Sequence, residues 1–344
     1  MRYRLLGRAA ALRVSEVALG TGKFGRVVPP ERAREVLACY ADAGGRFIDT
    51  AAGYQGGQSE KIVGAFVGSQ RDDFVIGTKW AVGMMRDEPF PGRGTSRKAM
   101  TRSVEASLRR LGTDYVDVLW THGFDRETPV EEIMAGFDQL VTAGKILYAG
   151  LGTHPAWKVA RAATIAELRG WTPLAAITTE YGAAERDAER ELLPAAEAIG
   201  FGVVAWSPLG GGFLARPSQE GKAPASHLPH WTNAVRPTTR DLSVHAAVHD
   251  IARELDAAPA AVGYAWLLDR ARHSTTSIVP VMAASHPEQL RQSLRALDLQ
   301  LSDEQRHRID AAGEPHLGEP HVHNLDSDPL YFPGEHYQPA IPAA

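Results

Sequence analysis

Short apolar runs alternate with longer segments of helical period along most of the chain. The runs are rich in β-branched residues and end in a polar residue or a glycine. Continuously apolar runs such as 203–205 indicate strands that are buried on both faces, as in a parallel sheet. The pattern predicts eight βα units, with strands at Val17–Gly20, Arg46–Asp49, Phe74–Lys79, Tyr115–His122, Ile146–Gly150, Ala175–Glu180, Gly202–Trp206 and Thr276–Pro280.

Eight consecutive βα units favour an α/β fold of the closed (β/α)8 TIM barrel type. The first four helices have readable start signals, which are Pro30 with Glu31, Ser59 with Glu60, Ser96, and Thr128 with two glutamates. No linker is clean enough to mark a domain boundary. We therefore expect residues 1–344 to form a single domain.

Two regions lie outside the repeat. Tyr3–Val14 is expected to form a hairpin that closes the N-terminal mouth of the barrel, with Gly7 and Arg8 at its turn. After the last βα unit, 286–296 and 302–312 have the pattern of two extra helices. The segment 313–344 has six prolines and four histidines without a period, which predicts an irregular tail over the opposite mouth.

The composition is that of a globular protein that binds small molecules. Hydrophobic residues make up 44% and charged residues 23%, and the formal net charge of −4 gives no cationic surface for nucleic acid or an anionic membrane. Cys39 is the only cysteine, so no internal disulfide is expected. We find no leader peptide and no apolar run long enough to span a bilayer, so the cytoplasm is the expected location. The sequence leaves homo-oligomerisation open.

The segment Gly20–Gly25 satisfies the glycine pattern of dinucleotide-binding sheets, and Asp49 ends the next strand near the position of a ribose-binding acid. In that fingerprint a helix begins within the glycines. Here Val27, Val28 and a Pro-Pro pair intervene, and the later βα units leave no room for a separate catalytic domain. We instead expect these glycines to let the backbone at a barrel rim approach a ligand.

The stronger signal is positional. Asp49, Lys79 and His122 each end a successive predicted strand, and Tyr54 follows Asp49 in its loop. Any one of them alone is an ordinary capping acid, surface charge or rim histidine. Because barrel strands direct their carboxyl ends to one pocket, the four together predict an active site. A lysine held by a carboxylate would lower the pKa of a tyrosine, and a histidine would polarise a carbonyl oxygen.

Several motifs resemble one known family. They are Phe47-Ile48-Asp49-Thr50-Ala51 with Tyr54, Ser59-Glu60 and Gly64, Thr78-Lys79, the run from Ser107 to Tyr115 with His122, Ala143-Gly144-Lys145-Ile146, and Trp206-Ser207-Pro208-Leu209. Over about residues 3–301 the chain resembles the aldo-keto reductases. The resemblance implies a carbonyl reductase that uses NADP(H), with Tyr54 as general acid, Lys79 and Asp49 as its tuning pair and His122 as the orienting donor.

The resemblance also places the cofactor. It implies that Trp206 stacks on the nicotinamide and that the residues after it hold the pyrophosphate. The adenosine phosphate would lie near the last strand, where three positions depart from the family: Ala283 for glycine, Ser285 for arginine and Ser293 for asparagine, which leaves NAD(H) open. The expected cofactor residues are Gly20, Thr21, Thr153, Thr178, Trp206, Ser207, Pro208, Leu209, Gly210, Gly212, Ala283, Ser285, Gln289 and Ser293.

A second departure concerns the nicotinamide carboxamide. The family usually holds it with Ser-Asn or Ser-Asp and a glutamine, and this chain has Gly152, Thr153 and Thr178 there. We therefore expect weakened cofactor binding, which the triple change to Ser, Asn and Gln should restore. This departure keeps two alternatives open: an enzyme of the same type without redox chemistry, such as a dehydratase or cyclase, and a nucleotide-sensing binding subunit.

The substrate is expected to be a small-molecule carbonyl compound in an aromatic-walled pocket. Phe24, Trp80 and Trp120 are the candidate walls, with Tyr331, Phe332 and Tyr337 from the tail. No metal is expected, because the pairs His227/His230 and His321/His323 lie in loop and tail as solvated polar residues.

Overall fold

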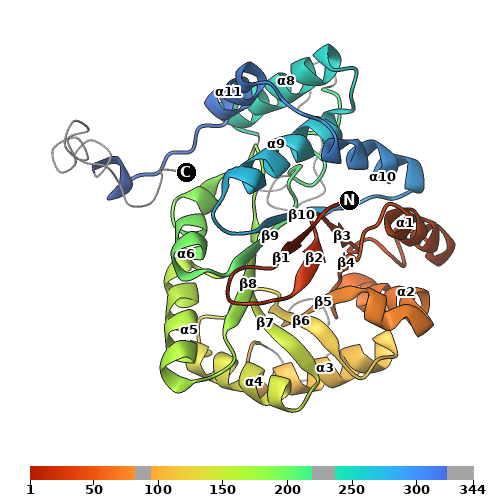
Figure 1. The fold of residues 1–344 in the computed structure, drawn as a ribbon, viewed down its shortest axis with the longest axis vertical. Coiled ribbons are helices and arrows are strands. Elements are labelled where there is room, and N and C mark those ends of the chain that lie inside the picture. Colours follow the sequence, from red (N-terminus) through yellow and green to blue (C-terminus); the bar gives the residue numbers. More distant parts are fainter. Residues whose placement is uncertain (82–93, 219–236, 324–344) are drawn as a thin grey trace.

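In the computed structural model, which describes residues 1–81, 94–218 and 237–323, parallel strands close into a barrel (Figure 1). The strand order is β10-β3-β4-β5-β6-β7-β8-β9, so that neighbours in the sequence are also neighbours in the barrel. This confirms the predicted TIM barrel and its eight strands. The strands are β3 (Ala18–Gly20), β4 (Phe47–Asp49), β5 (Val75–Trp80), β6 (Val116–Thr121), β7 (Ile146–Gly152), β8 (Leu174–Glu180), β9 (Gly202–Trp206) and β10 (Ile278–Met282).

Helices surround the barrel. None of those in the described part of the chain combines the length and the apolar character that crossing a membrane requires. Helix starts at Pro30 and Ser96 follow the prediction, whereas Ser59 and Thr128 lie near a helix start but do not cap it. The helices are α1 (Pro30–Asp42), α2 (Gln58–Val67), α3 (Arg97–Leu111), α4 (Val130–Thr142), α5 (Ala156–Arg169), α6 (Leu192–Ile199), α8 (Thr239–Glu254), α9 (Pro259–His273), α10 (Pro287–Leu294) and α11 (Asp303–Ala312), with 3₁₀ turns η1 (Tyr54–Gly57), η2 (Gly68–Asp73), η4 (Asp187–Glu189) and η5 (Arg295–Leu297).

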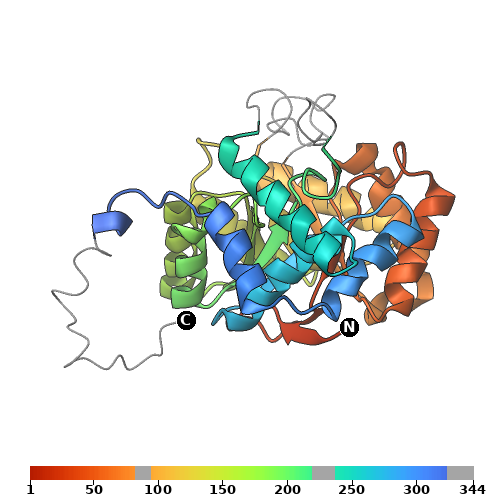
Figure 2. The ribbon, with the colours of Figure 1, turned by 90° about the horizontal axis from the view of Figure 1, so that it is seen from above.

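The predicted N-terminal hairpin is formed by β1 (Tyr3–Leu5) and β2 (Arg13–Ser15), and it lies at the end of the barrel where the strands begin (Figure 2). Gly7 packs against the backbone of Phe201 and Gly202 at that end. The tail differs from its prediction where it is described. His321 Nε2 lies 3.1 Å from Oε1 of Glu191, which directly precedes α6 on the outside of the barrel. Residues 324–344 lie outside the described residues.

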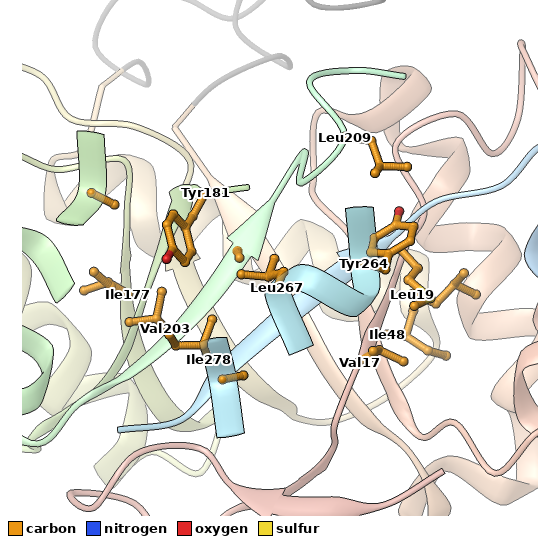
Figure 3. Close-up of a cluster of buried hydrophobic side chains, with 14 of the residues drawn as sticks. Val17, Leu19, Ile48, Ile177, Tyr181, Val203, Leu209, Tyr264, Leu267 and Ile278 are labelled. Atoms are coloured by element: carbon orange, nitrogen blue, oxygen red, sulfur yellow. The ribbon is translucent and has the colours of Figure 1, made fainter. Parts of the chain in front are cut away.

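The core has two layers. The larger lies between the barrel and its helices, where Leu19 of β3 and Ile48 of β4 lie in one buried cluster with Tyr264 and Leu267 of α9 (Figure 3). The smaller fills the barrel interior, which the hairpin closes with Leu6. Both faces of the sheet are therefore buried, which explains the continuously apolar strands.

Trp120 belongs to this interior and not to a substrate pocket. Its ring is fully buried and occupies the space left by Gly77 and Gly150, since a Cβ at Gly150 would lie 2.1 Å from Trp120 Cε3. Trp80 points to the other face of the sheet, where its ring meets Phe137 of α4 edge-on with centroids 5.4 Å apart. Both side chains are buried away from the cavity described below, and the expectation that they line it is corrected.

Because the ring of Trp120 fills the barrel interior, we expect it to contribute strongly to the free energy of unfolding. Trp120→Ala should lower the free energy of unfolding by about 3 to 5 kcal/mol, because it leaves a cavity in the barrel interior. Urea unfolding measures the change. The matched control is Trp157→Ala, whose side chain is 63% exposed and whose loss should cost less than about 0.5 kcal/mol. Equal effects of the two changes would contradict the packing described here.

Candidate active site

A cavity of about 750 Å³ opens at the carboxyl ends of the barrel strands. It brings together Asp49 from the end of β4, Lys79 from β5, His122 after β6 and Tyr54 from η1. These are the four residues that the sequence pattern placed at one pocket. Their convergence follows from the parallel strands, whose ends meet at one face of the barrel.

Lys79 is the centre of this group. Its Nζ donates hydrogen bonds to Asp49 Oδ2 at 2.5 Å, to the Thr50 carbonyl oxygen at 2.9 Å and to the Tyr54 hydroxyl at 3.3 Å. The rings of Tyr54 and His122 lie 5.4 Å apart and nearly perpendicular. A buried ammonium is thus held between a carboxylate and a phenol that faces the cavity.

Hydroxyl groups below the cavity fix the strand ends that carry these residues. The Ser59 hydroxyl contacts Thr50 Oγ1 at 2.9 Å and donates to Thr21 Oγ1 at 2.7 Å, and Thr21 Oγ1 donates to the Asp49 carbonyl oxygen at 3.0 Å. Thr21 is fully buried here and does not line the cavity, which corrects its assignment to the cofactor. Its side chain instead supports Asp49.

A second buried network supports Lys79. The carboxylate of Glu60 accepts hydrogen bonds from Thr78 Oγ1 and from Arg110 Nε, both at 2.6 Å. Thr78 directly precedes Lys79 on β5. The sequence predicts only a helix start at Ser59 and Glu60. It does not indicate the pairing of Glu60 with Arg110, because Arg110 belongs to α3, far along the chain.

Burial and charge set the protonation of the site. Burial raises the pKa of Tyr54 above its ordinary value of 10, and the ammonium of Lys79 opposes this without cancelling it. Burial disfavours charge on Lys79, but the carboxylate of Asp49 and the hydroxyl oxygen of Tyr54 outweigh it and raise the pKa of Lys79. Lys79 thus lowers the pKa of Tyr54, as the sequence predicts, but burial outweighs it and the pKa of Tyr54 stays above its ordinary value. Tyr54 keeps its proton at neutral pH.

The segment after β9 brings backbone to the cavity. Trp206, Ser207, Pro208 and Leu209 line it. Ser207 (φ 48°), Gly211 (φ 64°) and Gly212 (φ 94°) all adopt left-handed backbone conformations, which bring a chain close to a ligand. One of the expected glycines is corrected: Gly211 lines the cavity, whereas Gly210 does not.

The charge of the cavity is positive. Lys23, Lys79 and Arg216 line it against a single carboxylate, Asp49, among the described residues. Burial and the neighbouring charge of Arg216 both lower the pKa of Lys23. Two cations that face one cavity from the loops after β3 and β9 favour an anionic ligand. No pattern in the sequence points to either of them, since their approach depends on how the barrel closes.

The residues expected at the adenosine end also line the cavity. They come from the segment after β10 and are Ala283, Ser285, Gln289 and Ser293. Gly20 at the end of β3 lines the same part of the cavity. Gln289 Oε1 accepts hydrogen bonds from the Ser285 amide at 2.8 Å and from its hydroxyl at 3.1 Å. Ser285 and Gln289 therefore hold one another.

Comparison with known proteins decides the family. The model of the Aldo/keto reductase family matches residues 16–314. The chain belongs to this family. It is 34% identical over 322 residues to norsolorinic acid reductase of Emericella nidulans, covering 90% of this chain and 80% of that protein. It is 31% identical over 332 residues to an aryl-alcohol dehydrogenase of Pestalotiopsis microspora, covering 93% and 84%. This aldo-keto reductase is an oxidoreductase.

Within this aldo-keto reductase, Gly152 and Thr153 form a tightly held corner of the cavity. The Gly152 amide donates to Thr121 Oγ1 at 2.7 Å, and its carbonyl oxygen lies 2.8 Å from Nδ1 of His154. Burial lowers the pKa of His154 to about 4, so the ring is neutral at pH 7. Thr153 adopts a left-handed φ of 54° and lines the cavity with Thr178.

The corner cannot accept the family's usual serine. A Cβ on Gly152 would lie 2.1 Å from the Thr121 carbonyl oxygen, which is backbone and cannot rotate away. The expectation that restoring all three family residues tightens the cofactor grip is therefore wrong at this position. The close packing of β6 against β7 requires a glycine at position 152.

Lys79→Met should raise the pKa of Tyr54 further, because the ammonium that stabilises the phenolate is lost. Spectrophotometric titration of tyrosinate, with the Tyr54→Phe variant subtracted, isolates this residue. An unchanged titration in Lys79→Met would contradict the coupling.

Gly152→Ser should destabilise the protein by about 1 to 3 kcal/mol, because it overpacks the strand pair. It should not tighten nucleotide binding. The control is Thr153→Asn at the next position, where asparagine tolerates the left-handed backbone better than a β-branched residue and should retain stability. Thermal unfolding and fluorescence titration with NADPH measure both. Tighter binding by a stable Gly152→Ser protein is the result that contradicts the clash.

Proposed function

We propose that the protein reduces an aldehyde or ketone to an alcohol with NADPH. The observation that carries the proposal is the contact of Lys79 with both Asp49 and Tyr54 in a cavity that favours an anion. A phenol beside a buried ammonium is a proton donor whose conjugate base is stabilised in place.

The residues have separate tasks in this proposal. NADPH supplies the hydride to the carbonyl carbon. Tyr54 donates its proton to the carbonyl oxygen, and Lys79 stabilises the phenolate that remains. Asp49 keeps Lys79 charged and oriented. His122, whose ring stands edge-on to Tyr54, donates to the carbonyl oxygen and aligns it with the phenol. Hydride and proton together give the alcohol.

The described residues fit a dinucleotide. We propose that Trp206 stacks on the nicotinamide and that Ser207, Leu209 and the glycines after them approach the pyrophosphate. Thr153 and Thr178 offer hydroxyls to the carboxamide in place of the usual amide side chains. Lys23 and Arg216 support NADPH over NADH, because the cofactor with the extra phosphate gains more from a positive cavity. Ser285, Gln289 and Ser293 remain the proposed contacts of the adenosine end.

The names of the relatives support an aromatic substrate. An aryl-alcohol dehydrogenase and a norsolorinic acid reductase are both about one-third identical to this chain over most of its length. Phe24 lies at the cavity, but its side chain is only 1% exposed, so the support for this class comes from the relatives. We therefore propose an aromatic carbonyl compound as the substrate class.

A second candidate keeps the same four residues without redox chemistry. Thr153 and Thr178 favour it, because they lack the amide groups that usually hold the nicotinamide. In a dehydratase or cyclase of this kind, Tyr54 would still transfer a proton, but no reduced cofactor would be consumed. Stoichiometric loss of NADPH with product formation distinguishes the two.

Tyr54→Phe should lower turnover by a factor of about 10² to 10⁴, the usual contribution of a general acid. Its affinity for NADPH should stay within about twofold of the parent protein, because the ring remains and only the hydroxyl is lost. Initial rates from the absorbance of reduced nicotinamide and a binding titration give both values. A variant that keeps near-normal turnover would end the proposed mechanism.

A further inference from the structure

Glycines line much of the cavity, and most of them are required by the fold. Gly211 and Gly212 have left-handed φ angles. A Cβ on Gly20 would lie 2.7 Å from Val281 Cγ1, and one on Gly152 would meet backbone. Gly22 differs from these glycines. Its φ lies outside the left-handed region, and a Cβ there meets nothing closer than 3.7 Å. Neither conformation nor packing requires a glycine at position 22.

Gly22 faces the proposed proton donor. A Cβ on this residue would lie 3.7 Å from Cζ of Tyr54 and 3.8 Å from each of Cε1 and Cε2. These three carbons are the half of the ring that carries the hydroxyl. Any side chain larger than a methyl group would therefore extend over the hydroxyl end of Tyr54 or into the cavity that Gly22 lines.

The backbone at Gly22 is held in place. The side-chain amide of Gln55, the residue after Tyr54, donates a hydrogen bond of 2.9 Å to the Gly22 carbonyl oxygen. Gln55 itself has a left-handed φ of 51°, so the chain turns sharply after Tyr54. The open space over the phenol is thus bounded by fixed backbone.

We propose that Gly22 is a specificity-determining residue, which leaves the hydroxyl end of Tyr54 uncovered so that a flat aromatic carbonyl compound fits against it. This inference rests on the proposed function and narrows its substrate class. A ring system next to the carbonyl lies across the bare backbone of Gly22 while the carbonyl oxygen reaches Tyr54.

The test compares substrates of different width in Gly22→Leu and in the parent protein. The probes are 2-naphthaldehyde, benzaldehyde, cyclohexanecarbaldehyde and butanal, each with saturating NADPH. The ratio of kcat/KM for 2-naphthaldehyde to that for butanal should fall by about 10-fold to 200-fold in Gly22→Leu. Even one methylene group too many in an apolar pocket changes substrate discrimination by about this factor. The parent should prefer benzaldehyde to cyclohexanecarbaldehyde, which is not flat.

Gly22→Ala keeps the test valid if the leucine variant does not fold, because its methyl group makes only ordinary contact with Tyr54. It should lower the same ratio in the same direction by a smaller factor. Gly170→Ala, at the end of α5 and outside the cavity, is the control for a distant substitution: its left-handed φ of 62° strains an alanine, but the ratio should stay unchanged. Affinity for NADPH, measured by fluorescence titration, should not change in the Gly22 variants.

Equilibrium binding of 2-naphthylmethanol separates this inference from the proposed function. If the parent reduces carbonyl compounds but the substrate ratio and the alcohol affinity are the same in Gly22→Leu, the role of Gly22 is overturned and the reductase stands. If no carbonyl compound is reduced but 2-naphthylmethanol binds the parent at least 10-fold more tightly than it binds Gly22→Leu, the proposed function fails and the role of Gly22 is supported.

Discussion

The site depends on one interaction, the buried ion pair between Lys79 and Asp49. Removing either charge from water costs several kcal/mol, so each stays charged only because the other is in contact with it. The barrel supplies that contact by ending β4 and β5 side by side. The remaining bonds of Lys79 go to the Thr50 carbonyl oxygen and to Tyr54, so the same ammonium that neutralises Asp49 also acts on the phenol.

The position of the four central residues could be predicted from the sequence because one rule governs them. Parallel strands in a barrel direct their ends to one face, so polar residues at strand ends meet there. The same reasoning failed for Trp80 and Trp120. Both faces of the sheet are apolar in a barrel, so the sequence does not tell which face a strand residue occupies, and both rings proved to be core.

Other features depend on distances between backbones that no sequence pattern reports. The family resemblance predicts that Gly152 is a lost cofactor contact, but the residue lies where β6 and β7 leave no space for a Cβ. The approach of Lys23 and Arg216 arises from two loops on either side of β10. The net direction of the Tyr54 pKa also required the structure, because it is decided by the depth of burial against the charge of Lys79.

The cavity thus combines a protonated phenol at one end with positive charge and exposed backbone along its wall. In our account these parts bind a reduced dinucleotide and deliver hydride and proton to the two ends of one carbonyl group. The most direct test uses NADPH that carries deuterium on the transferable position of its dihydronicotinamide ring, with an aromatic aldehyde as substrate. The account predicts that the alcohol product carries this deuterium on the former carbonyl carbon. Conversion of the substrate to a product without deuterium at that carbon would contradict it.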